Sequence, residues 1–256
     1  MLGWAEHNLD TLTTSMLAFQ KTNPYGLWSD VDEETGERRL RISITDIHHP
    51  DEWTFQIGDI VHNLRVALDY IAFKHAARLD PGITSDIKRL RNVMFPICER
   101  LNDWPATVGR LGWASEEMRI RLAALQPYHR PDLANLHPLL MLNRLDNPHK
   151  HQSLLQAAPT VTNIDFDLND PRGVASISRM GLEGPFENGA VVARVRFNSP
   201  PVRIPHTRPS QVNMRVGFQV AFGEACALNG FPAMPLLLQI AKHIEEVVFP
   251  AVEPVI

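Results

Sequence analysis

Two stretches of the sequence concentrate the side chains that could do chemistry. The first covers residues 58–70 and places four polar side chains three or four residues apart: Asp59, His62, Arg65 and Asp69. On a helix they fall within a sector of about 120°, opposite the apolar face. Apolar residues share that sector, so we expect the helix to be covered on both sides. Enclosed polar groups need partners, and the four therefore indicate either a binding site or a network that ties helices together.

The second stretch is a polar helix end, residues 143–151, that follows a very apolar run. Its polar members are Asn143, Arg144, Asp146, Asn147, His149, Lys150 and His151. We expect Pro148 to kink the helix and restart it, with Asn147 as the N-cap. After such a restart His151 faces the core and His149 points elsewhere, because residues two apart on a helix diverge by about 200°.

A ribonuclease of the HEPN kind is one function that this second stretch could serve. Such enzymes use an Arg followed, after four to six residues, by a His, and Arg144 has this spacing to both His149 and His151. The His would shuttle a proton during attack by the 2′-hydroxyl while the Arg stabilises phosphate charge. Against it, such spacings arise by chance about two or three times in a chain of this composition. In addition, Leu145 stands where those domains usually carry a polar residue, and Pro148 interrupts the helix.

A metal-dependent hydrolase is a second alternative. Asp59, His62 and Asp69 from one helix, with a histidine of the second stretch, would suit zinc or manganese. However, Arg65 in the same sector would repel a cation, and the sequence has no HExxH signature. We therefore predict neither a bound metal nor a cofactor.

Four motifs together resemble a widespread family of bacterial hypothetical proteins. They are GDxxHNLRxALD at 58–69, FPI at 95–97, LQPY at 125–128 and NxxKH at 147–151. The chain departs from the family pattern at Tyr70, His149 and Gln152, where the family is expected to have His, Asp and Arg. Because the family has no established activity, the resemblance implies a shared fold and a shared polar cluster rather than a reaction.

Composition narrows the class of protein. The 256 residues are 44% hydrophobic and 21% charged, which is typical of a globular chain. The formal charge of −4 provides no global basic field, which disfavours a dedicated duplex-DNA binder. Cys98 and Cys226 form no CxxC pair and indicate a reducing compartment. With no signal peptide and no apolar run of about 18 residues, we expect a cytoplasmic protein that does not enter a membrane.

Hydrophobic periodicity predicts the elements that must position these groups. Spacings of three and four predict helices over about 1–20, 53–79, 115–125, 138–158 and 235–249. The first of these has an apolar stripe suited to a bundle seam, from which we expect a homodimer. Two-residue alternation predicts a hairpin over 25–31 and 39–45 and later strands over 164–168, 174–180, 191–197 and 214–222.

These elements predict an α+β fold. One antiparallel β-sheet, made of the N-terminal hairpin plus the C-terminal strands, is expected to pack against a helical layer. We predict a single domain over 1–256, with the helical layer at about 1–20, 53–158 and 233–250. The β layer is expected at about 25–48 and 160–223.

The function that needs the fewest assumptions is a non-enzymatic module that binds a ligand or a partner. In it the cluster of the first stretch, with Asn147 and Lys150, is a structural network. Arg194 and Arg196 share the outer face of one strand, and we interpret them as a solvated face rather than an RNA platform, because no exposed aromatic residue is expected beside them. RNA stays open as a partner through the ribonuclease alternative, and the sequence does not decide whether the protein is an enzyme.

Overall fold

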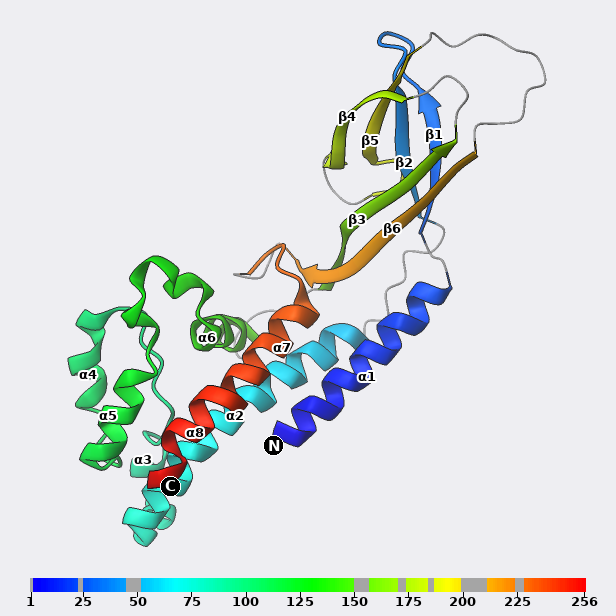
Figure 1. The fold of residues 1–256 in the computed structure, drawn as a ribbon. Coiled ribbons are helices and arrows are strands. Elements are labelled where there is room, and N and C mark those ends of the chain that lie inside the picture. Colours follow the sequence, from blue (N-terminus) through cyan, green and yellow to red (C-terminus); the bar gives the residue numbers. More distant parts are fainter. Residues whose placement is uncertain are drawn as a thin grey trace. The chain divides into compact units, whose positions relative to one another are not determined.

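A computed structural model confirms the α+β class and describes eight stretches of the chain (Figure 1). These are residues 2–22, 25–44, 52–149, 157–169, 174–183, 187–198, 211–223 and 228–256. The chain divides into two compact units. The helical unit comprises Met1–Thr13, Pro50–Ala157 and Phe222–Ile256, and the sheet unit comprises Thr14–His49 and Ala158–Ala221. The single domain with its helical and β layers stays a prediction.

The helical unit is organised around α2 (Glu52–Leu79), which contacts α6 (Pro138–His149) and α7 (Ala233–His243). α2 buries the apolar face predicted from the sequence, and each member is at most 1% exposed: Ile57, Ile60, Val61, Leu64, Leu68 and Ile71. The other helices are α1 (Leu2–Lys21), which is divided between the two units, α3 (Ile87–Leu90), α4 (Trp104–Val108), α5 (Glu116–Ala124) and α8 (Phe249–Val252).

Short turns connect these helices, and one helix begins at a side-chain N-cap. 3₁₀ turns cover Pro81–Ser85, Leu101–Asp103, Pro127–His129, Pro131–Leu136 and Glu253–Val255, and a π-helical turn, Ile244–Val248, joins α7 to α8. α5 begins at Ser115, whose hydroxyl accepts a hydrogen bond from the Met118 N–H at 3.2 Å, as a favourable N-cap does. Within the described ranges, no helix combines the length and the apolar character needed to cross a membrane.

The sheet unit contains a four-stranded sheet and a separate pair of strands. β1 (Tyr25–Val31), β2 (Arg38–Ile44), β5 (Val191–Phe197) and β4 (Val174–Glu183) lie in the order β1-β2-β5-β4, with antiparallel neighbours. The N-terminal hairpin thus joins two of the later strands, as predicted. β3 (Ala157–Asn169) and β6 (Gln211–Phe222) pair with each other in a two-stranded sheet.

The turn between β1 and β2 is held by side-chain hydrogen bonds and a glycine. The Asp32 carboxylate accepts hydrogen bonds from the backbone N–H groups of Glu34 and Thr35, at 3.1 and 3.2 Å. Gly36 takes the left-handed conformation with φ 69°, which glycine adopts without steric cost. One face of the sheet is apolar and buried through Leu40, Ile42, Ala193 and Val195, each at most 1% exposed. The charged residues that alternate with these four lie on the opposite face.

Two expectations for the end of α6 are wrong. Asn147 and Pro148 are both helical, so Asn147 is not an N-cap and Pro148 does not restart a helix. A proline at this position removes one helical hydrogen bond, and the helix ends one residue later, at His149. The helix also does not extend to residue 158, since β3 begins at Ala157. The inward orientation expected for His151 lies outside the described residues.

Candidate functional site

Arg65 and Asp69 of α2 clamp the backbone of a distant residue. The Arg65 guanidinium donates to both Asp69 oxygens, with Nη2–Oδ1 at 2.8 Å and Nε–Oδ2 at 3.3 Å. Arg65 Nη2 also donates to the Phe95 carbonyl at 2.8 Å, and Asp69 Oδ1 accepts from the Phe95 N–H at 2.9 Å. The Arg65 side chain is only 9% exposed. A bidentate pair that is also bound to backbone in this way satisfies groups that would be costly to bury alone.

Gln126, from the LQPY motif, holds the residues that follow Phe95. Its Oε1 accepts from the Cys98 N–H at 2.8 Å. Its Nε2 donates to the carbonyls of Pro96 at 3.1 Å and Leu122 at 2.8 Å. The residue is 1% exposed, and three of the hydrogen bonds that an amide can make are formed inside the protein.

Arg144 of α6 holds the end of the same segment. Its Nη2 donates to Glu99 Oε1 at 3.2 Å and to Asn135 Oδ1 at 2.8 Å. The charge of the guanidinium is therefore partly neutralised by a carboxylate. This arrangement suits a structural role better than the stabilisation of phosphate charge in a reaction.

Residues 93–99, which we name the clamped segment, give a structural role to three of the sequence motifs: GDxxHNLRxALD, FPI and LQPY. The segment forms neither helix nor strand, yet Val93, Phe95, Pro96 and Cys98 are buried. Buried backbone N–H and C=O groups must be paired, and regular secondary structure is not available to pair them here. Side chains from α2 and from residue 126 make the bonds instead. Arg65 and Asp69 of the predicted polar cluster thus support backbone.

His62 and Asp146 connect the two stretches that the sequence singled out. His62 Nδ1 lies 4.0 Å from Asp146 Oδ1, with the side chains 57% and 2% exposed. This is an electrostatic contact, longer than a hydrogen bond. Asp59, one turn earlier on α2, is exposed. The expectation of a fully covered sector is therefore wrong, because only its C-terminal half, with Arg65 and Asp69, reaches the clamped segment.

The remaining predicted site residues lie at the limit of the described chain. Asn147 and His149 belong to the last turn of α6, and Lys150 and His151 lie outside the described residues. The proposed pairing of Arg144 with either histidine therefore stays a prediction. Among the side chains that the structure describes, no three of His, Cys, Asp and Glu gather as a metal site.

Two histidines that sequence reasoning missed meet at one end of α6. His137 precedes the helix, and its ring lies edge-on to that of His243 with centroids 5.1 Å apart. His137 Nδ1 accepts from the Leu139 N–H at 3.3 Å, as an N-cap side chain would. Burial, then the proximity of His243 and Arg130, lowers the pKa of His137 to about 4. Burial also lowers the pKa of His243, so both rings are neutral at pH 7.

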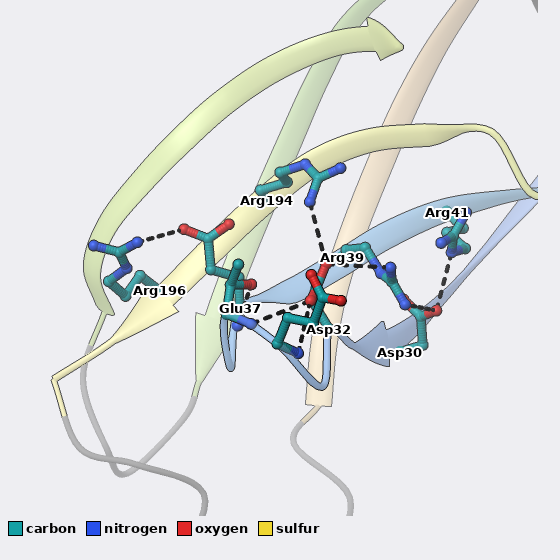
Figure 2. Close-up of polar contacts among 9 residues, drawn as sticks. Asp30, Asp32, Glu37, Arg39, Arg41, Arg194 and Arg196 are labelled. Carbon is teal, nitrogen blue, oxygen red and sulfur yellow. Dashed lines mark hydrogen bonds and ion pairs between the residues drawn. The ribbon is translucent and has the colours of Figure 1, made fainter. Parts of the chain in front are cut away.

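The outer face of the four-stranded sheet carries a connected group of charges, which we name the arginine face (Figure 2). Its members are Asp30, Asp32, Glu37, Arg39, Arg41, Arg194 and Arg196. Asp30 lies 2.8 Å from Arg39 and 3.1 Å from Arg41. Asp32 lies 3.3 Å from Arg39 and 3.6 Å from Arg194, and Glu37 lies 2.9 Å from Arg196. Each aspartate is thus shared by two arginines.

Hydrogen bonds keep these groups charged. The side chain of Arg39 lowers the pKa of Asp30, against the effect of its partial burial, and Arg41 adds to this lowering. The backbone N–H of Thr35 is the main cause that lowers the pKa of Asp32. In turn, the Asp30 carboxylate raises the pKa of Arg39. At neutral pH every one of these three side chains therefore carries its full charge.

An exposed tryptophan adjoins the arginine face. Trp28 of β1 pairs in register with Arg41 of β2, and the guanidinium carbon lies 5.6 Å from the centroid of the indole ring. Trp28 is 46% exposed. Trp28 lies beside Arg41 and not beside Arg194 or Arg196, so the expectation that those two arginines have no exposed aromatic neighbour stays a prediction. The register of the predicted hairpin would have placed Trp28 beside Arg41.

No family model, curated protein or solved structure matches the chain. The resemblance carried by the four motifs therefore stays a prediction.

Proposed function

We propose that the protein is a non-enzymatic binding module that holds an anionic partner on its arginine face. The observation that carries this proposal is the arrangement of four guanidinium groups and three carboxylates on one face of the sheet. Four positive charges against three negative ones leave an excess of one positive charge. The carboxylates fix the guanidinium groups in place, which lowers the entropy that a partner must remove when it binds.

The exposure of Arg196 supports the same function. The Arg196 side chain is 62% exposed while its partner Glu37 is 9% exposed, so the cation is turned outward and the anion inward. An arginine presents five N–H donors in a planar fork that matches carboxylate and phosphate groups. An anionic partner can therefore reach the Arg196 guanidinium before it meets the Glu37 carboxylate.

The hydrogen bonds of four polar side chains in the helical unit argue against a catalytic role for them. Arg65, Asp69 and Gln126 are bound to the backbone of the clamped segment, and Arg144 is bound to Glu99. A catalytic group must be able to reach a reacting atom. Side chains that are hydrogen-bonded to buried backbone groups cannot do so. This argument favours the binding module over the ribonuclease and hydrolase alternatives.

Isothermal titration with inorganic polyphosphate tests the binding surface. The double variant Arg194→Gln, Arg196→Gln should bind polyphosphate at least about tenfold more weakly. The slope of the logarithm of its binding constant against the logarithm of the salt concentration should be shallower by about 0.7 for each lost contact. The double variant Arg89→Gln, Arg110→Gln removes two exposed arginines of the helical unit and should bind like the wild type. No binding by the wild type, or an equal loss in both variants, would overturn the proposal.

Turnover tests the non-enzymatic part of the proposal. Wild type, His62→Ala and Arg144→Ala are incubated with a mixed RNA pool and with a chromogenic phosphodiester. We expect no difference between the three proteins. A cleavage activity that the wild type has and the folded variants lack would show that the protein is an enzyme.

A further inference from the structure

Trp28 is an exposed aromatic residue in contact with a cation of the arginine face. Tryptophan offers a large apolar ring, and an aromatic ring beside positive charges is the combination that surfaces binding single strands use. On β1 its position lies on the same face as Asp30, and the hairpin register sets it directly opposite Arg41. The residue therefore adjoins the arginine face rather than the buried apolar face formed by Leu40 and Ile42.

The surroundings of Trp28 hold its ring in one orientation. The Arg41 guanidinium is fixed by Asp30, with Nε–Oδ2 at 3.1 Å, and by the Gly189 carbonyl, with Nη1–O at 2.7 Å. This fixed cation attracts the indole face beside it, as in other cation–π contacts. With 46% of the residue exposed, the ring offers apolar surface that is already oriented. Little side-chain freedom remains to be lost when a flat group stacks on it.

We infer that the anionic partner is a single-stranded nucleic acid, with one base stacked against Trp28 and neighbouring phosphates on the arginines. This inference rests on the proposed function, because it names the partner of the same surface. A planar base uses the indole ring, and its backbone phosphates use the guanidinium forks. An acidic peptide would use only the arginines and would leave Trp28 without a role. A duplex would keep its bases stacked within itself.

The dimensions of the sheet fit a short stretch of such a strand. Neighbouring β-strands lie about 4.8 Å apart, so β1 and β5 are separated by about 10 Å across the sheet. Trp28 is level with Arg41, whereas Arg196 is level with residue 37, which adds about 13 Å along the strands. Asp30 and Asp32 lie on the same surface and would repel a phosphate. However, each is shared by two arginines, whose charges offset that repulsion. At Arg196 the cation is the exposed partner, 62% against 9% for Glu37, so a phosphate meets the guanidinium first there.

Fluorescence anisotropy with three labelled probes tests this inference. The probes are a uridylate 15-mer, an abasic strand with the same number of phosphates, and a glutamate 15-mer. The wild type should bind the uridylate strand at least about fivefold more tightly than the abasic strand, because stacking on an aromatic ring stabilises a bound base. Trp28→Ala should remove that preference, and Trp28→Phe should restore most of it. Trp4→Ala removes a tryptophan that is 60% exposed on α1 and should change nothing.

The outcomes separate this inference from the function on which it rests. Equal binding of the uridylate and abasic strands, unaffected by Trp28→Ala, would overturn the nucleic-acid partner and leave the anion-binding surface intact. Stronger binding of the glutamate 15-mer would assign the surface to an acidic protein instead. If the wild type binds none of the three probes, the proposed function itself is wrong. Circular dichroism confirms that each variant is folded.

Discussion

His75 illustrates how a titratable side chain can be committed to the backbone. The residue is 2% exposed, and its Nδ1 lies 2.7 Å from the Val255 carbonyl. Its Nε2 accepts from the Ser115 N–H at 3.1 Å, so Nδ1 must carry the proton and donate. One imidazole thus joins α2, the start of α5 and the C-terminal turn. A buried histidine of this kind is a structural bridge, and its burial alone says nothing of catalysis.

The Arg65–Asp69 clamp predicts the effect of a single substitution. In Asp69→Asn the amide can still accept from the Phe95 N–H, but it no longer neutralises Arg65, whose side chain is 9% exposed. We expect the free energy of unfolding to fall by about 2–3 kcal/mol, because removing one partner leaves a buried charge without compensation. Urea denaturation followed by circular dichroism at pH 7 measures the loss.

A matched surface pair provides the control for that prediction. Arg121 and Glu117 have the same spacing of four residues on α5, with Nη2–Oε1 at 2.8 Å, but Glu117 is 62% exposed. Glu117→Gln should therefore change the stability by no more than about 0.5 kcal/mol. Equal losses in the two variants would mean that burial and the backbone clamp add nothing, and the structural interpretation of the cluster would be wrong.

At the scale of the helix, the start of α6 predicts a pH-dependent cap. His137 Nδ1 can accept from the Leu139 N–H only while that nitrogen is unprotonated. Asparagine is a favourable N-cap that does not titrate. At pH 7 we expect the free energy of unfolding of His137→Asn to lie within about 1 kcal/mol of that of the wild type. Between pH 6.5 and 4 this free energy should fall less in the variant than in the wild type. Urea midpoints measured at pH 7 and 5 test this expectation.

The control lies on another helix. His7 is exposed on α1, so His7→Asn should show the same acid dependence as the wild type. If His137→Asn loses stability on acidification as steeply as the wild type does, the cap is not the source of the effect.

Regular elements could be predicted from the sequence because their patterns are local. The helix around Ile57–Ile71 buries the residues that a 3.6-residue period selects, and the continuous apolar run Leu139–Leu142 is buried throughout. The strands were predicted equally well by their two-residue alternation. The end of α6 was not, since a proline in the last turn and a proline in the first turn of a new helix look alike in a sequence.

The candidate sites were harder to predict because their partners are distant. Arg65 and Asp69 were found as polar residues on one helix sector, but their partner is the backbone of Phe95, which no side-chain pattern reveals. Gln126 was part of a motif without a stated role for the same reason. The arginine face needed the register of two hairpin strands, in which Trp28 meets Arg41. Contacts set by tertiary structure leave little local signal.

At the scale of the whole molecule, the two units use charge differently. In the helical unit, polar side chains such as Arg65, His75 and Gln126 are buried and bound to backbone. In the sheet unit the charges of the arginine face lie at the surface and bind one another. The two units should therefore respond to acid over different ranges of pH.

The helical unit should lose stability first as the pH falls. The pKa of His137 is lowered from 6.5 to about 4, and that of His243 is lowered as well. Between these values the unfolded chain binds protons that the folded chain does not, so the free energy of unfolding decreases from pH 6.5 down to about 4. Asp30 and Asp32 have pKa values lowered below 3.8, so their contribution is present above pH 3.8 and disappears only as the pH falls through the lower folded values.

Hydrogen exchange measured by mass spectrometry can follow both units in one sample. After correction for the intrinsic pH dependence of exchange, peptides from α6 and α7 should lose protection between pH 6.5 and 4. Peptides from β1, β2 and β5 should keep theirs until the pH falls below 3.8. The wild type is compared with His137→Asn, in which the early loss should be smaller. Simultaneous loss of protection in both units above pH 4, in both proteins, would mean that neither the histidine pair nor the arginine face sets the acid response.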